Sequence, residues 1–340
     1  MSQPAKSSDP GYRHRGTGFP GVPVVRYPGA ADRIPPDPRP EPLRLRATGW
    51  AFLAVWEFTR RIPESWALRL AAGAARFAHR RGGAGQKQLR ANLARIVSAE
   101  QLDDAVHAAY LSYARYWVEA FRAADLPHDE VIARTTSDGF EKMDALLEEG
   151  RGAIVLLTHH GSWDVAARWG EAVNYHLAVI AELLRPRAVF RRFVKLRESM
   201  GVDIVPLRRG DDMVSPLVEK LAANHLVGLL AERDLTGKGP VVNFFGQPAR
   251  VPPGAVVLSQ RTNVPILPAA LLQRPGGRWH FEVFDAFEVT GMTVQEGCQK
   301  LAHAMEQIIS TDPTQWHAFQ PVWLADLPED RRGDWKPEPA

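Results

Sequence analysis

Short runs of consecutive apolar residues alternate with amphipathic segments over the C-terminal two thirds of the chain. The runs are bounded by turn residues, which is typical of buried strands. They span residues 153–157, 177–183, 202–207, 226–231, 264–272 and 279–284. Helical spacing of apolar residues predicts helices at about 163–174, 188–200, 212–224, 254–262 and 293–310. This pattern predicts an α/β fold whose central, mostly parallel sheet is covered by helices on both faces.

The segment 43–125 has only helical periodicity. Its first two helical stretches, 43–63 and 64–81, are rich in aromatic residues with arginines close by. Aromatic rings at the headgroup level and cations among lipid phosphates are what a helix lying in a membrane interface needs. Two amphipathic helices packed on the body of the protein would show the same pattern. The sequence leaves both interpretations open.

The ends of the chain differ from its middle in composition. Residues 1–42 hold 10 of the 27 prolines and few large aliphatic side chains, so we expect a disordered tail, and the sequence does not establish that it is translated. A second disordered tail is expected at 328–340. Between them we predict a single domain, 43–327, with a helical part at 43–125 and an α/β core at 139–310.

Composition narrows the class of protein. The chain has 340 residues, of which 45% are hydrophobic and 24% charged, which is enough apolar content for a sizeable core. A single cysteine, Cys298, excludes an intramolecular disulfide and a multi-cysteine zinc site. No apolar run reaches the roughly 18 residues of a membrane span, and the first residues lack the apolar stretch of a signal peptide. We therefore expect neither secretion nor membrane spanning.

The positive charge of the chain does not identify a partner. The formal net charge is +3 with a pI near 9.1, from 34 arginines and 8 lysines. Guanidinium groups suit phosphates and carboxylates, but a GC-rich genome would also favour arginine. No nucleic-acid-binding motif accompanies the charge, so we predict no nucleic-acid partner.

The turn that follows the apolar run 153–157 carries the candidate chemistry. The chain reads AIVLLTHHGSWD, a buried strand that runs into a polar turn and then into a predicted helix. In open α/β sheets, catalytic groups gather at the carboxyl ends of strands. Gly161 allows a turn tight enough to bring the Asp164 carboxylate to the His159 imidazole. A carboxylate on one ring nitrogen leaves the other free to remove a proton, which suits activation of a hydroxyl for acyl transfer.

Other interpretations of this turn compete. Adjacent histidines, here His159 and His160, are also found as metal ligands or as structural histidines, and Asp164 can cap the following helix. Without nearby cysteines or further histidines the metal interpretation is the weaker one. The spacing H-x4-D alone carries little information, so it is the strand–turn–helix context that favours catalysis.

This block resembles the H-x4-D/E block of the lysophospholipid (glycerolipid) acyltransferase superfamily. It is most similar to the branch of lipid A lauroyl/myristoyl acyltransferases and actinobacterial phosphatidylinositol mannoside acyltransferases, which typically has H-x-G-N-W-D/E; Ser162 replaces the Asn here. Further blocks resemble the same branch in order and spacing, and the last of them is closer to the mannoside enzymes. They lie at residues 114–122, 190–207, 229–271 and 311–327. The resemblance covers roughly residues 45 to 327.

The resemblance implies catalytic roles for three residues. His159 would be the general base and Asp164 its orienting carboxylate. Glu232 would assist the same histidine, and its position at the carboxyl end of the predicted strand 226–231 agrees with this. A salt bridge between Glu232 and Arg233 is the alternative.

Substrate-binding roles are implied as well. Arg197 would bind a phosphate of the acyl carrier, for which a bidentate guanidinium is suited, or would face solvent on its helix. The acyl groove would be walled by Phe244, Phe245 and Gly246, although paired phenylalanines are often plain core.

The function that the resemblance implies is O-acyl transfer from acyl-CoA at the cytoplasmic face of the cell membrane. The expected donor is palmitoyl-CoA and the expected acceptor is the mannose 6-hydroxyl of a phosphatidylinositol mannoside, with an anionic membrane surface as partner. CoA is then part of a substrate, and no cofactor or metal is expected. The alternatives are a lipid A-type enzyme that uses acyl carrier protein and a non-catalytic membrane-surface protein. An α/β hydrolase is disfavoured, since no G-x-S-x-G follows a strand.

Overall fold

The computed structural model describes residues 40–182, 185–207, 212, 214–234, 236–329 and 332. The tails predicted at 1–42 and 328–340 lie mostly outside this part of the chain, and the predicted domain boundaries stay predictions. The first helix begins at Leu43, where the helical part was expected to begin.

A seven-stranded sheet forms the centre of the protein, with strand order β1-β9-β8-β2-β5-β3-β4. All neighbours are parallel except β8 and β9, which form an antiparallel pair. The strands are β1 (Thr135–Asp138), β2 (Ala153–Leu157), β3 (Leu177–Glu182), β4 (Asp203–Leu207), β5 (Leu226–Leu230), β8 (Ile266–Arg274) and β9 (Arg278–Val283).

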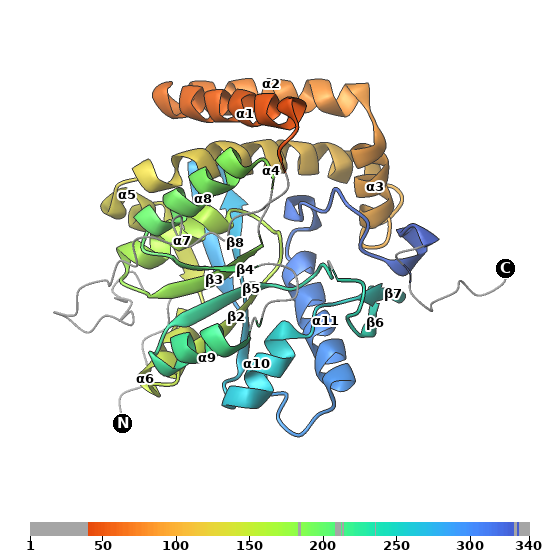
Figure 1. The fold of residues 1–340 in the computed structure, drawn as a ribbon. Coiled ribbons are helices and arrows are strands. Elements are labelled where there is room, and N and C mark those ends of the chain that lie inside the picture. Colours follow the sequence, from red (N-terminus) through yellow and green to blue (C-terminus); the bar gives the residue numbers. More distant parts are fainter. Residues whose placement is uncertain are drawn as a thin grey trace.

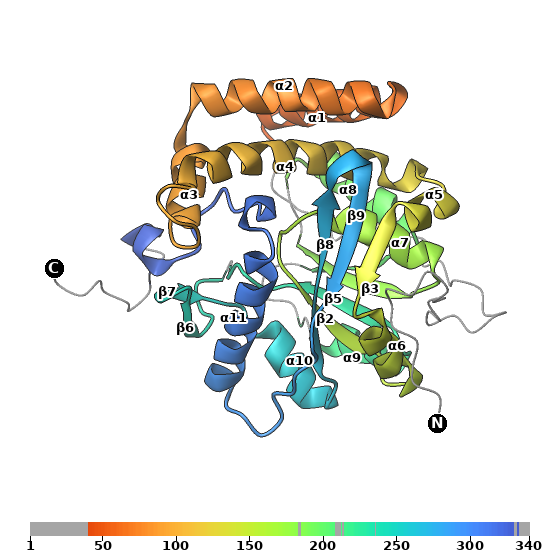
Figure 2. The same ribbon diagram turned by 180° about the vertical axis from the view of Figure 1, so that it is seen from behind.

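Helices cover both faces of this sheet (Figures 1 and 2). Those on one face are α9 (Val214–Ala222), α10 (Gly254–Thr262) and α11 (Val294–Ser310). Those on the other are α6 (Phe140–Glu148), α7 (Trp163–Ala172) and α8 (Arg187–Ser199). Alternate side chains of β2 explain the two layers, because Ile154 and Leu156 point into one core and Ala153 and Val155 into the other. The predicted α/β class is confirmed.

Each predicted strand and helix of the core is present, and helix α6 was missed together with several short elements. Strand β1 has the sequence TTSD and pairs only with β9, at the edge of the sheet, so little of it needs to be apolar. The short helix α5 (His128–Ala133) was also missed. A two-stranded hairpin, β6 (Val241–Phe244) and β7 (Gln247–Arg250), turns at two residues with positive φ.

The N-terminal helices form an outer layer. Helices α1 (Leu43–Arg61) and α2 (Glu64–Arg81) lie outermost, over the long helix α4 (Leu102–Arg122), and α3 (Ala84–Leu93) flanks them (Figures 1 and 2). The inner side of α1 belongs to the core, where Trp56 is 1% exposed and stacks on Phe121. The interfacial interpretation of α1 would place Trp56 at the membrane surface. Because this side chain is buried, it is not available there.

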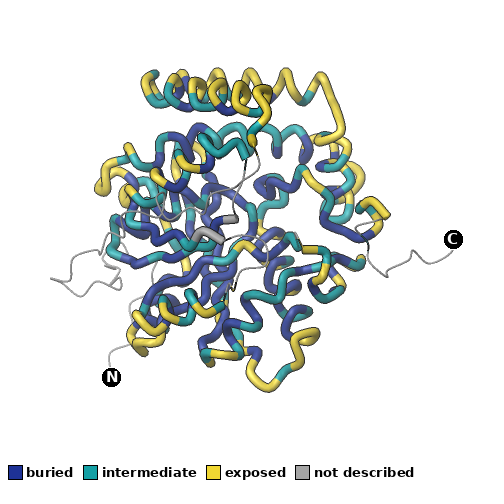
Figure 3. Tube along the Cα trace, viewed as in Figure 1, coloured by how far each residue is buried: buried dark blue, intermediate teal, exposed yellow. Residues whose placement is uncertain are grey.

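Large stretches of the same two helices are exposed (Figure 3), and a second set of apolar residues lies there. Its exposed members are Leu43, Trp50, Val55, Phe58, Trp66, Leu70 and Phe77. The inner side is packed on the body of the protein, and contact of the outer side with a membrane surface stays a prediction. None of the helices in the described ranges combines the length and apolarity that crossing a membrane requires.

Candidate active site

Two parallel neighbouring strands bring His159 and Glu232 together. Strands β2 and β5 pair in a register that places Leu157 beside Leu230. His159 lies two residues beyond Leu157, and Glu232 lies two residues beyond Leu230. Because the carboxyl ends of parallel strands meet at one edge of the sheet, the two side chains emerge next to each other.

Glu232 holds both the backbone and the ring of His159. Its Oε1 accepts the His159 N–H at 2.8 Å and is also hydrogen-bonded to His159 Nδ1. Burial alone would raise the pKa of Glu232, but the adjacent imidazole and these hydrogen bonds outweigh it and hold the pKa below its usual range. Glu232 is thus a carboxylate, and we assign the Nδ1 proton to the bond with it. This leaves Nε2 as the ring nitrogen that can take a proton.

The exposure of the pair matches this division of roles. The His159 side chain is 30% exposed, whereas that of Glu232 is 1% exposed. The edge of the His159 ring faces Trp163 at a centroid distance of 5.4 Å, and Trp163 stacks on Tyr116 at 4.0 Å. A substrate can therefore reach the imidazole beside an aromatic wall, while the carboxylate behind it stays away from water.

Asp164 has different partners from those predicted. It lies in the first turn of α7 and is 1% exposed. Its carboxylate accepts two hydrogen bonds from Arg197, from Nε at 2.8 Å and from a terminal nitrogen at 3.3 Å, and one from the Tyr116 hydroxyl at 3.1 Å. Among the described residues His159 is not one of its partners. The carboxylate on the imidazole is that of Glu232, because the β2–β5 register places it there, and Asp164 is turned toward α8 and α4.

The guanidinium of Arg197 is committed to this contact. Burial alone would lower the pKa of Arg197, but the Asp164 charge outweighs burial and raises it. Burial, and then the Asp164 charge, raise the pKa of Tyr116 well above its usual value, so its phenol remains a donor. The predicted contact between Arg197 and a phosphate of the acyl carrier stays a prediction; the structure shows this residue anchoring Asp164.

Gly161 makes the turn possible. Its φ is +62°, and a Cβ at this position would lie 1.9 Å from the Leu271 carbonyl oxygen of β8. The turn is also bonded to the C-terminal segment, since the Gly161 N–H donates to the Gln315 carbonyl at 3.0 Å and the His317 N–H donates to the His159 carbonyl at 2.8 Å. The backbone therefore needs a residue without a side chain here, as the sequence predicted.

Gly161→Ala is expected to destabilise the protein by more than about 3 kcal/mol, because the Cβ would strike backbone and the left-handed conformation disfavours a side chain. Thermal unfolding measures this. Gly73→Ala, in α2, is the matched control, because a Cβ there meets nothing within 4 Å and alanine favours a helix. Equal melting temperatures for the two variants would contradict the geometry of the turn.

His160 points away from His159. It is buried, its Nε2 contacts the Asp312 carbonyl at 2.8 Å, and burial lowers its pKa to about 4. The buried ring of His317 lies on the other side of the turn, 5.9 Å from Trp163, and its pKa is also lowered well below the usual value, first by burial and then by His160 and His159. The two adjacent histidines have separate environments, and within the described ranges no three His, Cys, Asp or Glu side chains are grouped to hold a metal ion.

These buried histidines predict acid sensitivity. When the pH falls below about 6.5, the unfolded chain binds protons at His160 and His317 that the folded protein does not bind until the pH is much lower. His160 should thus remove up to about 1.4 kcal/mol of unfolding free energy per pH unit between about pH 6.5 and 4, and His317 should act in the same direction. Urea unfolding across this range measures the effect. A free energy of unfolding that rises as the pH falls would contradict it.

The three residues predicted to wall the acyl groove have structural surroundings. Phe244 is 1% exposed and stacks on Trp323. The indole N–H of Trp323 donates a hydrogen bond to the Phe244 carbonyl at 2.8 Å. Phe245 and Gly246 form the β6–β7 turn, with φ of 46° and 77°, which the antiparallel hairpin requires. The plain-core alternative describes Phe244 well. A role for the three residues at the acyl chain stays a prediction.

Sequence reasoning missed a buried carboxylate behind the turn. Glu119 of α4 is 5% exposed and accepts hydrogen bonds from Arg115 Nε at 2.6 Å, Trp279 Nε1 at 3.1 Å and the Ser162 hydroxyl. Ser162 precedes α7, so this bond ties α4 to the start of the helix that carries Asp164. The signal in the sequence was an acidic residue on the otherwise apolar side of a long helix. Sequence reasoning also missed Tyr116 as a partner of Asp164.

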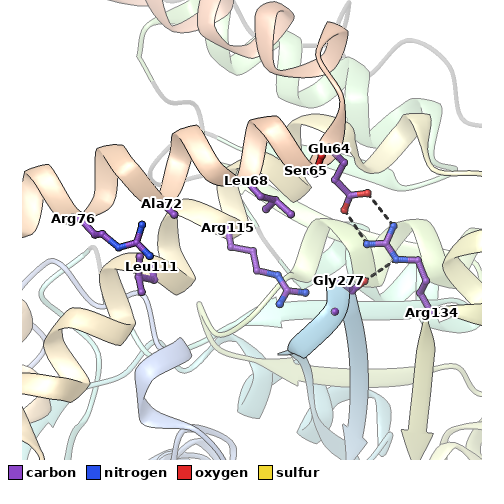
Figure 4. A pocket seen from close by; sticks show the side chains of 10 residues that line it. Glu64, Ser65, Leu68, Ala72, Arg76, Leu111, Arg115, Arg134 and Gly277 are labelled. Carbon is purple, nitrogen blue, oxygen red and sulfur yellow. Dashed lines mark hydrogen bonds and ion pairs between the residues drawn. The ribbon is translucent and has the colours of Figure 1, made fainter.

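Two hollows in the surface of the described structure lie away from these residues. The larger, of about 590 Å³, lies between α2, α4 and the β8–β9 turn, and none of the predicted site residues lines it (Figure 4). The smaller, of about 250 Å³, lies where α1 meets α8. The chemistry therefore belongs to the edge of the sheet at His159. There, a half-exposed imidazole with a buried carboxylate on one nitrogen can accept a proton from an alcohol and return it to a leaving group.

Comparisons with known proteins agree with this chemistry. The sequence profile of a family described as bacterial lipid A biosynthesis acyltransferase matches residues 39–325. The chain is 38% identical over 306 residues to proteins named phosphatidylinositol mannoside acyltransferase from two strains of Mycobacterium tuberculosis, covering 88% of this chain and 96% of each relative. A protein of the same name from Mycolicibacterium smegmatis is 36% identical over 295 residues, covering 86% and 96%.

Proposed function

The chain belongs to the bacterial lipid A biosynthesis acyltransferase family, and we propose that it transfers an acyl chain from acyl-CoA to a mannose hydroxyl of a phosphatidylinositol mannoside. Membership of this family, together with the names of its relatives, identifies the chain as an acyltransferase in glycolipid synthesis. The acceptor is proposed from the names of its relatives, and the palmitoyl chain and the mannose 6-hydroxyl from the sequence resemblance.

The observation that carries the proposal is the hydrogen-bonded pair of His159 and Glu232 at the carboxyl edge of β2 and β5. In the proposed reaction, His159 Nε2 takes the proton of the acceptor hydroxyl as its oxygen attacks the thioester carbonyl. A C–O bond forms, the C–S bond breaks, and the imidazolium returns the proton to the departing thiolate. The Glu232 carboxylate stabilises the imidazolium and holds its ring in position.

Asp164 acts one step further from the substrate. Its contacts to Arg197 and Tyr116 join α7, α8 and α4 around the turn. With Trp163 and Tyr116 stacked beside His159, these helices give the imidazole an apolar neighbour on one side. Such surroundings suit an acyl chain and disfavour water, which would otherwise hydrolyse the donor.

We place the reaction at the cytoplasmic face of the membrane. Support comes from the exposed apolar residues of α1 and α2, which include Trp50, Phe58, Trp66 and Phe77, and from the arginines of the same helices. Both substrates are amphiphiles, so an enzyme that lies on the bilayer meets them where they are dissolved.

Purified protein incubated with palmitoyl-CoA and a purified phosphatidylinositol mannoside is expected to yield a product heavier by one palmitoyl group, with release of free CoA. Mass spectrometry identifies the product and the position of the new ester. An enzyme that transfers only from acyl carrier protein, or only to a lipid A precursor, would contradict the proposed substrates. CoA release without an acylated acceptor would indicate a hydrolase.

A further inference from the structure

Three arginines line the smaller of the two hollows. It lies where the start of α1 meets the start of α8 and has a volume of about 250 Å³. Its lining consists of Glu41, Arg46, Trp50, Pro186, Arg187, Ala188 and Arg191. None of the residues to which the proposed reaction gives a role lines it.

A close helix contact brings these arginines together. Gly49 is buried in α1, and a Cβ there would lie 2.9 Å from Pro186 Cβ. Arg46 and Trp50 flank Gly49 on α1, while Arg187 and Arg191 are one turn apart at the start of α8. Since a side chain at position 49 would separate the helices, the small residue is what lets the two pairs line one hollow.

The protein leaves positive charge in this hollow. One acidic residue, Glu41, also lines the hollow. Its Oε1 accepts a hydrogen bond from the backbone N–H of Arg187 at 2.7 Å. Within the described part of the chain, the guanidinium groups of Arg46 and Arg191 have no hydrogen-bonded or ion-paired partner. Arginine without a carboxylate offers a planar fork of donors to a phosphate group.

The larger hollow provides a contrast. Two of its three arginines are already paired. Arg115 is paired with Glu119, and Arg134 is paired with Glu64 (Figure 4). Its positive charge is therefore mostly compensated from within, which distinguishes it from the hollow between α1 and α8.

The surroundings of the smaller hollow point to a lipid as the source of the phosphate. Trp50 lines the hollow and is 65% exposed, and it is one of the exposed apolar residues of α1 and α2 (Figure 3). Tryptophan at such a place lies at the headgroup level of a bilayer, with cations beside the phosphates. A soluble phosphate would gain nothing from this neighbour.

We propose that the hollow between α1 and α8 binds the phosphate group of an anionic membrane phospholipid through Arg46 and Arg191. The lipid is a neighbour in the bilayer and not the substrate, and it fixes how the enzyme is oriented on the membrane. This inference rests on the membrane location proposed above and is independent of the acyl-transfer chemistry.

The test compares two double variants that lose the same charge. Full-length protein is sedimented with phosphatidylcholine vesicles that contain phosphatidylinositol. Arg46→Gln with Arg191→Gln is expected to weaken binding about tenfold or more. Arg69→Gln with Arg80→Gln, both exposed on α2, should weaken it less than about threefold, because these residues contribute only diffuse attraction. Equal losses, or no loss in the first pair, would overturn the proposal.

A second pair of variants leaves the charge unchanged. Gly49→Leu forces α1 away from Pro186 and is expected to weaken vesicle binding about as much as the first double variant, whereas Ala51→Leu, at an exposed position of α1, should not. Wild-type binding by a folded Gly49→Leu protein would overturn the claim that the hollow is built by this contact. Circular dichroism checks the fold.

Two further outcomes separate this inference from others. Tight binding of glycerol 3-phosphate by the wild type without vesicles, abolished in the first double variant, would overturn the lipid assignment in favour of a soluble phosphate. Acyl transfer is assayed separately in detergent micelles. If the wild-type protein transferred no acyl chain while the variants lost vesicle binding as expected, the proposed function would be contradicted and the phosphate site supported.

Discussion

Replacing His159 by alanine is expected to lower kcat for acyl transfer by about 10³-fold or more while the protein stays folded. General base catalysis contributes about 10²- to 10⁴-fold, and no other described side chain pairs an exposed ring nitrogen with a buried carboxylate at this edge of the sheet. Because the His159 side chain is 30% exposed, its removal leaves no closed cavity. Steady-state transfer to the glycolipid acceptor measures the loss.

His303→Ala provides the control for this experiment. His303 lies exposed on α11, away from the turn, so its loss should leave kcat unchanged. A His159→Ala enzyme with more than about a tenth of wild-type turnover would remove this residue from the mechanism.

Glu232→Gln and Asp164→Asn are expected to fail in different ways. Glutamine can still accept the His159 N–H, but it removes the negative charge that stabilises the imidazolium and no longer fixes the tautomer. We expect kcat to fall about 10²- to 10⁴-fold with little change in KM and little change in melting temperature.

Asp164→Asn instead leaves the Arg197 guanidinium without a counter-charge. Arg197 is 25% exposed, and breaking a largely buried pair costs about 3–5 kcal/mol of stability. Activity should fall together with the melting temperature. The double variant Asp164→Asn with Arg197→Gln should recover part of the stability, since it also removes the orphaned charge. If Asp164→Asn lowered kcat but kept the wild-type melting temperature, Asp164 would act on the chemistry more directly than its contacts indicate.

The sequence predicted the core elements well because their patterns are local. Strand β2 begins and ends at the residues predicted from the run AIVLL, and α10 likewise has its predicted bounds. Strand β1 could not be found in this way. It is polar, and its strand conformation comes from pairing with β9, more than a hundred residues away.

The partner of His159 shows where local reasoning ends. Asp164 is five residues away and was the natural choice for the imidazole, while Glu232 is 73 residues away and was placed beside it through a family resemblance. What decides between them is that β5 lies next to β2 in a register of Leu157 with Leu230. Strand order is a property of the whole sheet, and the apolar runs that predict strands do not encode it.

The N-terminal helices show a second limit. The periodicity of α1 is that of an amphipathic helix, but it does not tell which apolar residues face the protein. In the structure Trp56 faces inward and Trp50, nearly two turns earlier, faces outward. Only the packing of α1 on α4 and α8 separates the two roles.

Nitrogen NMR of the histidine rings tests the central claim most directly. In protein labelled at histidine nitrogens, the resonances lost in His159→Gln identify this ring among the 11 histidines. In the neutral ring we expect the proton on Nδ1, held by Glu232, which leaves Nε2 free to act as the base. A His159 ring that carries its proton on Nε2 in the wild-type enzyme would contradict the account.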